Sequence, residues 1–249
     1  MIDLHCHYLP FVDDGASSLP EAVALATAAV ANGIRHAVLT PHVFPGQWDN
    51  TRASLAAPFA AFRTMIETSD LPLGLSLGGE VRLLPECLEM AARGELPTIG
   101  AWDEDRVVLL ELPDSHVPPG TEKAVEFLRA RGYRPMIAHP ERNKDVMRDP
   151  RKLLPMLQQG CLLQVTAASV VGLFGAPAQR SALQLLDAGV VTVIASDAHN
   201  LQHRPPRMAE ARAALAARYG EPAAVLLTET HPGRVVGLVS TLPEPAVAA

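Results

Sequence analysis

The chain has little of what marks secreted, membrane-spanning or nucleic-acid-binding proteins. It has three cysteines, Cys6, Cys87 and Cys161, an odd number without close pairing, so we expect no disulfide framework. No apolar run is long enough to span a bilayer, and no basic region or apolar signal core precedes the first strand. The formal net charge is -6, which argues against a nucleic-acid-binding surface. We therefore expect a cytoplasmic protein without membrane insertion.

The chain is nevertheless long enough to bury a large core. Its 249 residues suit one α/β barrel domain better than two small domains. We predict a single catalytic barrel domain over residues 1–239. Residues 240–249 are rich in proline and alanine, and we expect them to form a loose tail.

Short apolar runs rich in β-branched residues recur along the chain. Continuous apolar runs suit strands that are buried on both faces, as in parallel sheets. The seven predicted strands are residues 2–5, 36–40, 73–78, 107–112, 135–139, 162–166 and 191–196. Helical patterns lie between them, among them residues 18–33, 121–131, 149–160 and 178–188. This alternation predicts a parallel barrel with helices outside, and a doubly wound open sheet is the alternative.

Ionisable side chains follow six of the seven predicted strands. Barrel enzymes place their chemistry at the carboxyl ends of the strands. The first strand ends in His-Cys-His and the last is followed by Asp-Ala-His, and alternate side chains of an extended segment point to one side. We therefore expect nine metal-capable side chains on one rim: His5, His7, Asp14, His42, Glu80, Glu111, His139, Asp197 and His199.

Five imidazoles and four carboxylates exceed the needs of one metal ion. A catalytic ion takes about three to five protein ligands, so two or three divalent ions are implied. Their residual positive charge would attract an anion such as phosphate. They would also lower the pKa of a bound water and supply hydroxide near neutral pH. Ligands without a thiolate favour a borderline or hard ion.

Arginines near this rim are candidates for binding phosphate. Arg142 follows the fifth strand and Arg204 follows the last one, and a guanidinium matches the oxygens of a phosphate. Arg207 is the alternative to Arg204. Asp13 is interpreted as a residue that shapes a turn with Gly15. The other histidines are interpreted as ordinary core or surface residues: His36, His116, His203 and His231.

The spacing of Cys87 and Arg93 matches the minimal signature of cysteine-dependent phosphatases. That chemistry needs a tight loop that cradles phosphate around a thiolate of low pKa. The residues between them contain no glycine and form a strong helix-forming run, so we do not expect cysteine catalysis. Cys6 should point away from the ions, into the barrel wall. No serine-hydrolase or P-loop pattern is present.

Together these motifs resemble the polymerase-and-histidinol-phosphatase (PHP) superfamily. Within it they are most similar to the capsule-type, manganese-dependent bacterial protein tyrosine phosphatases. The similar segments run through nearly the whole chain in the family's order. They are residues 2–7, 9–10, 13–16, 40–42, 79–80, 111–113, 138–142, 171–175, 196–200 and 204–205.

The resemblance implies a distorted (β/α)7 barrel of the PHP fold, similar to a TIM barrel, with a site for three metal ions. It implies Mn2+, with iron, zinc, cobalt and magnesium as alternatives. By the family's pattern, Arg142 and Arg204 grip the phosphoryl group. One ion is held by His5, His7, Glu80 and Asp197, a second by Glu80, Glu111 and His139, and a third by Asp14, His42 and His199.

The resemblance also implies a substrate, which is phosphotyrosine on a protein partner. We expect this partner to be the tyrosine-rich tail of a bacterial kinase that controls exopolysaccharide or capsule export. The residues 43–50 and 164–169 depart from the family's pattern, although Phe44 and Trp48 could accept an aromatic ring. The alternatives are a small-molecule phosphatase of the histidinol-phosphate or nucleotide type, and a metal-binding module without turnover. An amidohydrolase would need a different ligand order, commonly with a lysine, and we find none on a predicted strand.

Overall fold

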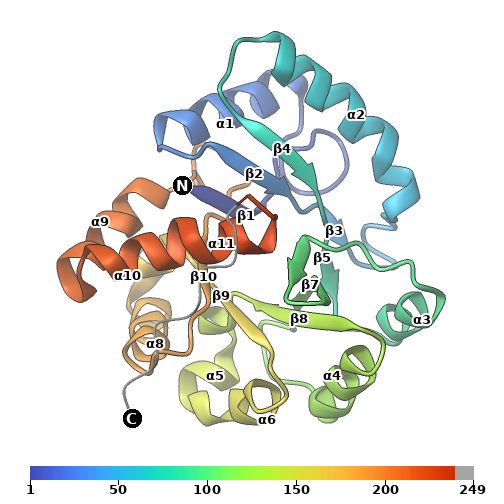
Figure 1. Ribbon diagram of the computed structural model, residues 1–249, viewed down its shortest axis with the longest axis vertical. Helices are drawn as coiled ribbons and strands as arrows, with labels where there is room; N and C mark the ends of the chain where they lie inside the picture. Colours follow the sequence, from blue (N-terminus) through green and yellow to red (C-terminus); the bar gives the residue numbers. More distant parts are fainter. Residues whose placement is uncertain (239–249) are drawn as a thin grey trace.

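Strands and helices alternate through residues 1–238, the part of the chain that the computed structural model describes (Figure 1). All seven predicted strands are present, and three short strands were not predicted. The predicted tail at residues 240–249 lies outside the described residues. The strands are β1 (Ile2–Cys6), β2 (His36–Leu39), β3 (His42–Val43), β4 (Gly74–Leu77), β5 (Glu80–Arg82), β6 (Gly100–Trp102), β7 (Asp105–Glu111), β8 (Tyr133–Ala138), β9 (Leu162–Thr166) and β10 (Val193–Ala195).

Helices surround these strands in Figure 1. The predicted helix at residues 149–160 is instead a short 3-10 turn followed by a single α-helical turn. Pro155 lacks the N–H that a continuous α-helix would donate to the carbonyl of Arg151. The helical elements are α1 (Leu19–Ala31), α2 (Arg52–Thr68), α3 (Pro85–Arg93), α4 (Thr121–Arg129), η1 (Pro140–Arg142), α5 (Lys144–Arg148), η2 (Pro150–Leu153), α6 (Leu154–Leu157), α7 (Ala167–Val170), α8 (Gly175–Asp187), α9 (Met208–Tyr219), α10 (Glu221–Val225), η3 (Leu226–Thr230) and α11 (His231–Val235).

The parallel strands follow one another around a distorted barrel in the order of the sequence. One sheet has the order β1-β2-β4 and the other β10-β9-β8-β7-β5-β3, while β6 pairs antiparallel with β7. Two backbone hydrogen bonds join the ends of β1 and β10: Asp197 N donates to His5 O over 2.7 Å, and His7 N donates to Ala198 O over 2.9 Å. The barrel prediction is confirmed, and the doubly wound alternative is wrong because the strand order nowhere reverses.

Two of the predicted strands continue beyond a break, and the second piece of each carries a candidate ligand. Residues 40–41 separate β2 from β3, and residues 78–79 separate β4 from β5. His42 and Glu80 are paired in parallel register on the two second pieces. The breaks therefore move one strand pair from the sheet of β1 to the sheet of β7, and they set two ligands side by side.

The second break depends on a close approach that only glycine allows. A Cβ atom on Gly78 would lie 2.7 Å from Ile99 Cγ2, and one on Gly79 would lie 2.7 Å from Pro97 Cγ. Real side chains do not approach so closely. The two glycines thus let the chain bend against the segment before β6, and this bend aims Glu80 at the rim.

The barrel encloses its own apolar core below this rim. Leu4, Val38, Leu109 and Val193 are fully buried and pack in one cluster, which Val235 of α11 joins. A larger cluster fills the space between the strands and the surrounding helices. No helix within residues 1–238 has the length and apolar character needed to cross a membrane.

Candidate metal centre

The nine predicted metal-capable side chains all lie on one rim, at or just after the carboxyl ends of barrel strands. Eight of them are buried, and only Asp14, in the loop between β1 and α1, is exposed. Ligand atoms of eight of them, all except His139, form three overlapping groups, in each of which the atoms lie within 4.8 Å of one another. The groups are His7, Asp14, His42 and His199; His5, His7, Glu80 and Asp197; and His42, Glu80 and Glu111.

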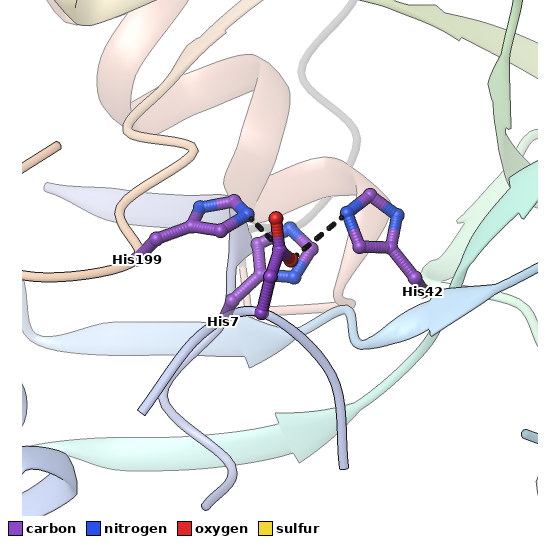
Figure 2. Close-up of side chains that lie close together, drawn as sticks. His7, His42 and His199 are labelled. Atoms are coloured by element: carbon purple, nitrogen blue, oxygen red, sulfur yellow. Dashed lines mark ion pairs between the residues drawn. The ribbon is translucent and has the colours of Figure 1, made fainter. Parts of the chain in front are cut away.

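Asp14 lies between two imidazoles of the first group, and Figure 2 shows the rings of His199 and His42 on either side of His7. Its Oδ1 lies 3.3 Å from His42 Nε2 and 3.3 Å from His199 Nε2. The ring of His7 stacks on that of His199, with the ring centroids 3.8 Å apart. Three imidazoles and one carboxylate thus face a common point at the open side of the rim.

The second group is the most deeply buried. Glu80 Oε2 lies 3.1 Å from His5 Nε2 and 3.4 Å from His7 Nε2. Asp197 Oδ1 lies 3.2 Å and 3.5 Å from the same two atoms. The two imidazoles of the His-Cys-His sequence therefore point to one side, as an extended segment requires.

Unpaired polar atoms in these groups fit bound cations. Glu80 Oε2, Asp197 Oδ1, His42 Nδ1 and His199 Nε2 are buried and have no hydrogen-bond partner among the described residues. Burying polar atoms without partners is costly, and divalent ions bound at the separate ligand groups would supply partners for all four. Mixed imidazole and carboxylate donors suit a borderline or hard divalent ion.

Burial and neighbouring charges shift the pKa values of the ionisable groups in this site in different directions. Burial alone would raise the pKa of Glu80, but the charges of His5 and His42 hold that pKa well below its ordinary value. Burial and the charge of Glu80 raise the pKa of Glu111 to about 7. Burial, with the charge of His7, lowers the pKa of His199 to about 4. Neutral imidazole is the form that binds a metal.

Side chains behind the candidate ligands fix the orientation of their rings. His7 Nδ1 lies 2.8 Å from Asp13 Oδ2, and His5 Nδ1 lies 2.9 Å from Gln164 Oε1. Each contact leaves the Nε2 atom facing the other candidate ligands, which is the usual arrangement behind a metal-binding histidine. The sequence reasoning missed both roles. Asp13 does shape the turn, since it accepts from Gly15 N over 2.9 Å, but it also holds His7.

His139 and Asp197 have an unusual backbone. Both adopt positive φ angles, 32° and 50°, which non-glycine residues rarely do. Such strain persists where the surroundings impose it, and it gathers at functional sites. His139 Nε2 bonds Glu80 Oε1 over 2.8 Å, so it contacts the carboxylate shared by two groups while lying outside the three groups themselves.

Arg142 and Arg204 both donate to the outer oxygen of Asp197. Arg142 Nη1 contacts Asp197 Oδ2, and Arg204 Nη2 lies 2.6 Å from the same atom. The two arginines line a cavity of about 220 Å³ above the ligand groups. Arg207, the alternative to Arg204, instead pairs with Glu210 in α9.

The same cavity contains an arginine that the sequence reasoning missed. Arg82 Nη1 lies 2.9 Å from Glu111 Oε1. The aromatic residues Phe44 and Trp48 also line the cavity, and Trp48 stacks on His42 with ring centroids 4.6 Å apart. The Glu-Val-Arg order, which puts Arg82 on the same side of a strand as Glu80, was the available signal.

The cysteines do not resemble nucleophiles. Cys87 is buried in α3, and burial raises the pKa of its thiol to about 12. The predicted helix over this segment is confirmed, and it provides no phosphate-binding loop. Cys6 points away from the ligand groups, as predicted, with its Sγ 3.4 Å from Val38 O.

Comparisons with known proteins agree with this geometry. The profile of the capsular polysaccharide synthesis family CpsB/CapC matches residues 1–237. The chain is 34% identical over 229 residues to the tyrosine-protein phosphatase YwqE of Bacillus subtilis, and this alignment covers 92% of this chain and 89% of the relative. It is 28% identical over 241 residues to the tyrosine-protein phosphatase CpsB of Streptococcus pneumoniae, covering 95% of this chain and 98% of the relative.

Solved structures extend the comparison to the fold. The chain matches a structure from a study of YwqE and CpsB, described as unique metal-dependent tyrosine phosphatases, with a TM-score of 0.88 and 31% identity, covering 97% of this chain and 96% of that one. An organophosphorus hydrolase from Deinococcus radiodurans matches with a TM-score of 0.57 and 16% identity, covering 94% and 91%, and shares the fold alone. A family profile that spans nearly the whole chain and relatives of this similarity show that the protein belongs to the CpsB/CapC family of capsular polysaccharide synthesis.

Proposed function

We propose that this chain is a metal-dependent tyrosine-protein phosphatase. The observation that carries the proposal is the position of Asp197. One of its oxygens faces His5 and His7, while the other accepts from Arg142 and Arg204 at the cavity wall. Ligand groups for cations and a pair of guanidinium groups therefore meet at one carboxylate. The names of the relatives YwqE and CpsB support the same reaction.

We further propose how the site holds its ions. When bound, divalent ions, in our proposal Mn2+, lower the pKa of a coordinated water and offset the charge of the phosphoryl oxygens. The chain supplies neutral imidazoles and carboxylates already turned toward common points. The proposed ligand sets are His5, His7, Glu80 and Asp197 for one ion, Glu80, Glu111 and His139 for a second, and Asp14, His42 and His199 for a third.

Arg142 and Arg204 bind and orient the phosphoryl group in this proposal. Their side chains are about one fifth and one quarter exposed, so they reach the cavity while their guanidinium groups stay anchored on Asp197. The phenyl ring of the substrate lies against Phe44 and Trp48. A phenolate has a pKa of about 10, so it needs less help from a general acid than an alkoxide does when it leaves.

We propose that the substrate is a phosphotyrosine protein, the tail of a bacterial tyrosine kinase that controls exopolysaccharide or capsule export. The family's link to capsular polysaccharide synthesis supports this partner. We also propose a cytoplasmic location, which agrees with three free cysteines, all of them buried.

Relative turnover of three substrates tests the proposal. The Mn2+-loaded protein is assayed on a phosphotyrosine tail peptide, the matched phosphoserine peptide and histidinol phosphate. We expect kcat/KM to favour phosphotyrosine by at least about tenfold, which is about 1.4 kcal/mol of transition-state discrimination. A tenfold preference for histidinol phosphate would establish the small-molecule alternative instead. Mn2+ binding without turnover of any of the three esters would establish a binding module.

A further inference from the structure

Arg82 lies at the rim of the metal cavity, and the proposed reaction gives it no task. It follows Glu80 by two residues on β5, and its side chain is 18% exposed. Its Nη1 lies 2.9 Å from Glu111 Oε1 and 3.1 Å from the carbonyl oxygen of Leu112. A guanidinium group with two such partners is fixed in place.

The two oxygens of Glu111 face different neighbours. Oε1 accepts from Arg82, whereas Oε2 lies 4.0 Å from His42 Nδ1, in the ligand group that also contains Glu80. Asp197 shows the same division, with arginines on its outer oxygen and imidazoles near its inner one. Glu80 and Glu111 are carboxylates of one buried group, so their charges repel each other, and the guanidinium of Arg82 beside Glu111 offsets part of that repulsion.

Residues 43–50 hold Arg82 from its other side. The Arg82 guanidinium lies over the ring of Phe44, 4.8 Å from its centroid. Phe44 and Trp48 exchange backbone hydrogen bonds of 3.0 Å and 2.8 Å, and their rings meet edge to face. Trp48 in turn stacks on His42 at an interplanar angle of 13°. The contacts run from Glu111 through Arg82, Phe44 and Trp48 to His42, so they connect two candidate ligands of one group.

We propose that Arg82 is a positioning residue that turns Glu111 toward a metal ion, with Phe44 and Trp48 keeping Arg82 and His42 in place. The inference rests on the proposed function only in that the ligand groups bind cations. It also gives residues 43–50, which depart from the family's pattern, a structural task. A direct role of Arg82 in binding the phosphoryl group is the competing assignment.

Metal binding by the metal-free protein separates these assignments without any substrate. The variants are Arg82→Met, which removes the charge, and Arg82→Lys, which keeps the charge but not the planar stacking. Arg106→Met is the matched control, because Arg106 lies over the ring of Tyr133 at 4.0 Å near the opposite end of β7. Mn2+ per chain is measured by mass spectrometry. Affinity is measured by the fluorescence change on titration, which Trp48→Phe assigns to Trp48.

Arg82→Met should weaken the weakest Mn2+ site about 10- to 100-fold, as loss of a partner behind a ligand commonly does. Arg82→Lys should restore part of this affinity, and Arg106→Met should change nothing. On a small phosphate ester, kcat should fall while KM and inhibition by inorganic phosphate stay within about twofold of the parent. In a Glu111→Gln background, Arg82→Met should add less than about a twofold effect, because the residue it acts through is already altered.

Several outcomes would overturn the inference. Parental Mn2+ affinity in Arg82→Met, or additive losses with Glu111→Gln, would show that Arg82 does not act through Glu111. A raised KM with weaker phosphate inhibition and intact Mn2+ binding would assign Arg82 to the phosphoryl group. If Arg82→Met does not fold, the Mn2+ affinity of Arg82→Lys is compared with that of the parent, and equal affinities refute the inference. A parent that binds no Mn2+ refutes both this inference and the proposed function, whereas Mn2+ binding without phosphotyrosine hydrolysis refutes only the latter.

Discussion

Asp13 connects two candidate ligands through a single oxygen. Its Oδ2 contacts His7 Nδ1 over 2.8 Å and accepts from His42 N over 3.0 Å. Asp13→Ala should therefore free the His7 ring and lower both Mn2+ affinity and kcat about 10- to 100-fold, while the fold stays intact. Metal analysis and turnover of a small ester measure this. Asp149→Ala is the control, since Asp149 accepts from the backbone N–H of Arg151 in an exposed turn outside the ligand groups, and an equal loss there would contradict the prediction.

The thiol of Cys87 should be unreactive in the folded protein and should take no part in catalysis. Burial raises the pKa of its thiol to about 12, so the nucleophilic thiolate is scarce near neutral pH. Cys87→Ser should leave kcat/KM within about threefold of the parent, and a thiol reagent should modify the protein only after unfolding. Absorbance on reaction with a disulfide reagent, before and after denaturant, checks this. A folded, Mn2+-loaded Cys87→Ser protein without activity would revive a thiolate mechanism.

At the scale of the element, strands could be predicted from the sequence where they form an uninterrupted run of apolar residues. The seven predicted strands each form a run of apolar residues typical of a buried strand, and all seven are present. The pieces β3 and β5 were missed because Pro41 and Gly79 look like the ends of strands. They are bends instead, since Gly78 N donates to Leu39 O over 2.8 Å and Glu80 N donates to Pro41 O over 3.1 Å. Local propensity cannot show such continuity, which depends on the neighbouring strand.

The candidate ligands were predictable and their supporting residues were not. Side chains at the carboxyl ends of parallel strands lie on the same rim of a barrel whatever the details of packing. Their positions in the sequence are therefore enough to predict them as candidate ligands. The roles of Asp13, Gln164 and Arg82 depend on which neighbour each side chain reaches across the barrel. Gln164 contacts His5 from 159 positions away, a distance at which spacing carries no information.

The loop between β1 and α1 depends on one glycine. A Cβ atom on Gly15 would lie 2.2 Å from His7 O and 2.6 Å from His7 Cβ, too close for any side chain. Gly15→Ala should displace the loop that carries Asp14 and lower the Mn2+ content per chain, measured by mass spectrometry. Gly74→Ala is the control, because its new methyl group would also clash, 2.7 Å from His36 Nδ1 and 3.6 Å from Arg35 O, but at the other end of the barrel. Full Mn2+ loading of Gly15→Ala would contradict the prediction.

At the scale of the molecule, the site closes the barrel. The ends of β1 and β10 meet through Cys6 and Ala198, beside the candidate ligands His5, His7 and Asp197. Segments from both ends of the chain thus share one cluster of buried ionisable groups. Without cations, Glu80 Oε2, Asp197 Oδ1, His42 Nδ1 and His199 Nε2 have no hydrogen-bond partner among the described residues, although they are buried. We therefore expect metal binding and folding to be coupled across the whole barrel.

This coupling predicts that removing metal lowers the stability of the entire protein. A ligand that binds only the folded state at a concentration of 100 times its Kd stabilises it by about 2.7 kcal/mol. For a chain of this length that corresponds to a Tm shift of about 5–10 °C. Tm is measured by calorimetry after chelation and again after Mn2+ is restored. Asp197→Asn, which removes a carboxylate shared by His5, His7 and both arginines, should respond much less to Mn2+. Equal Tm values of the parent with and without Mn2+ would show that the ligand groups do not bind the ion.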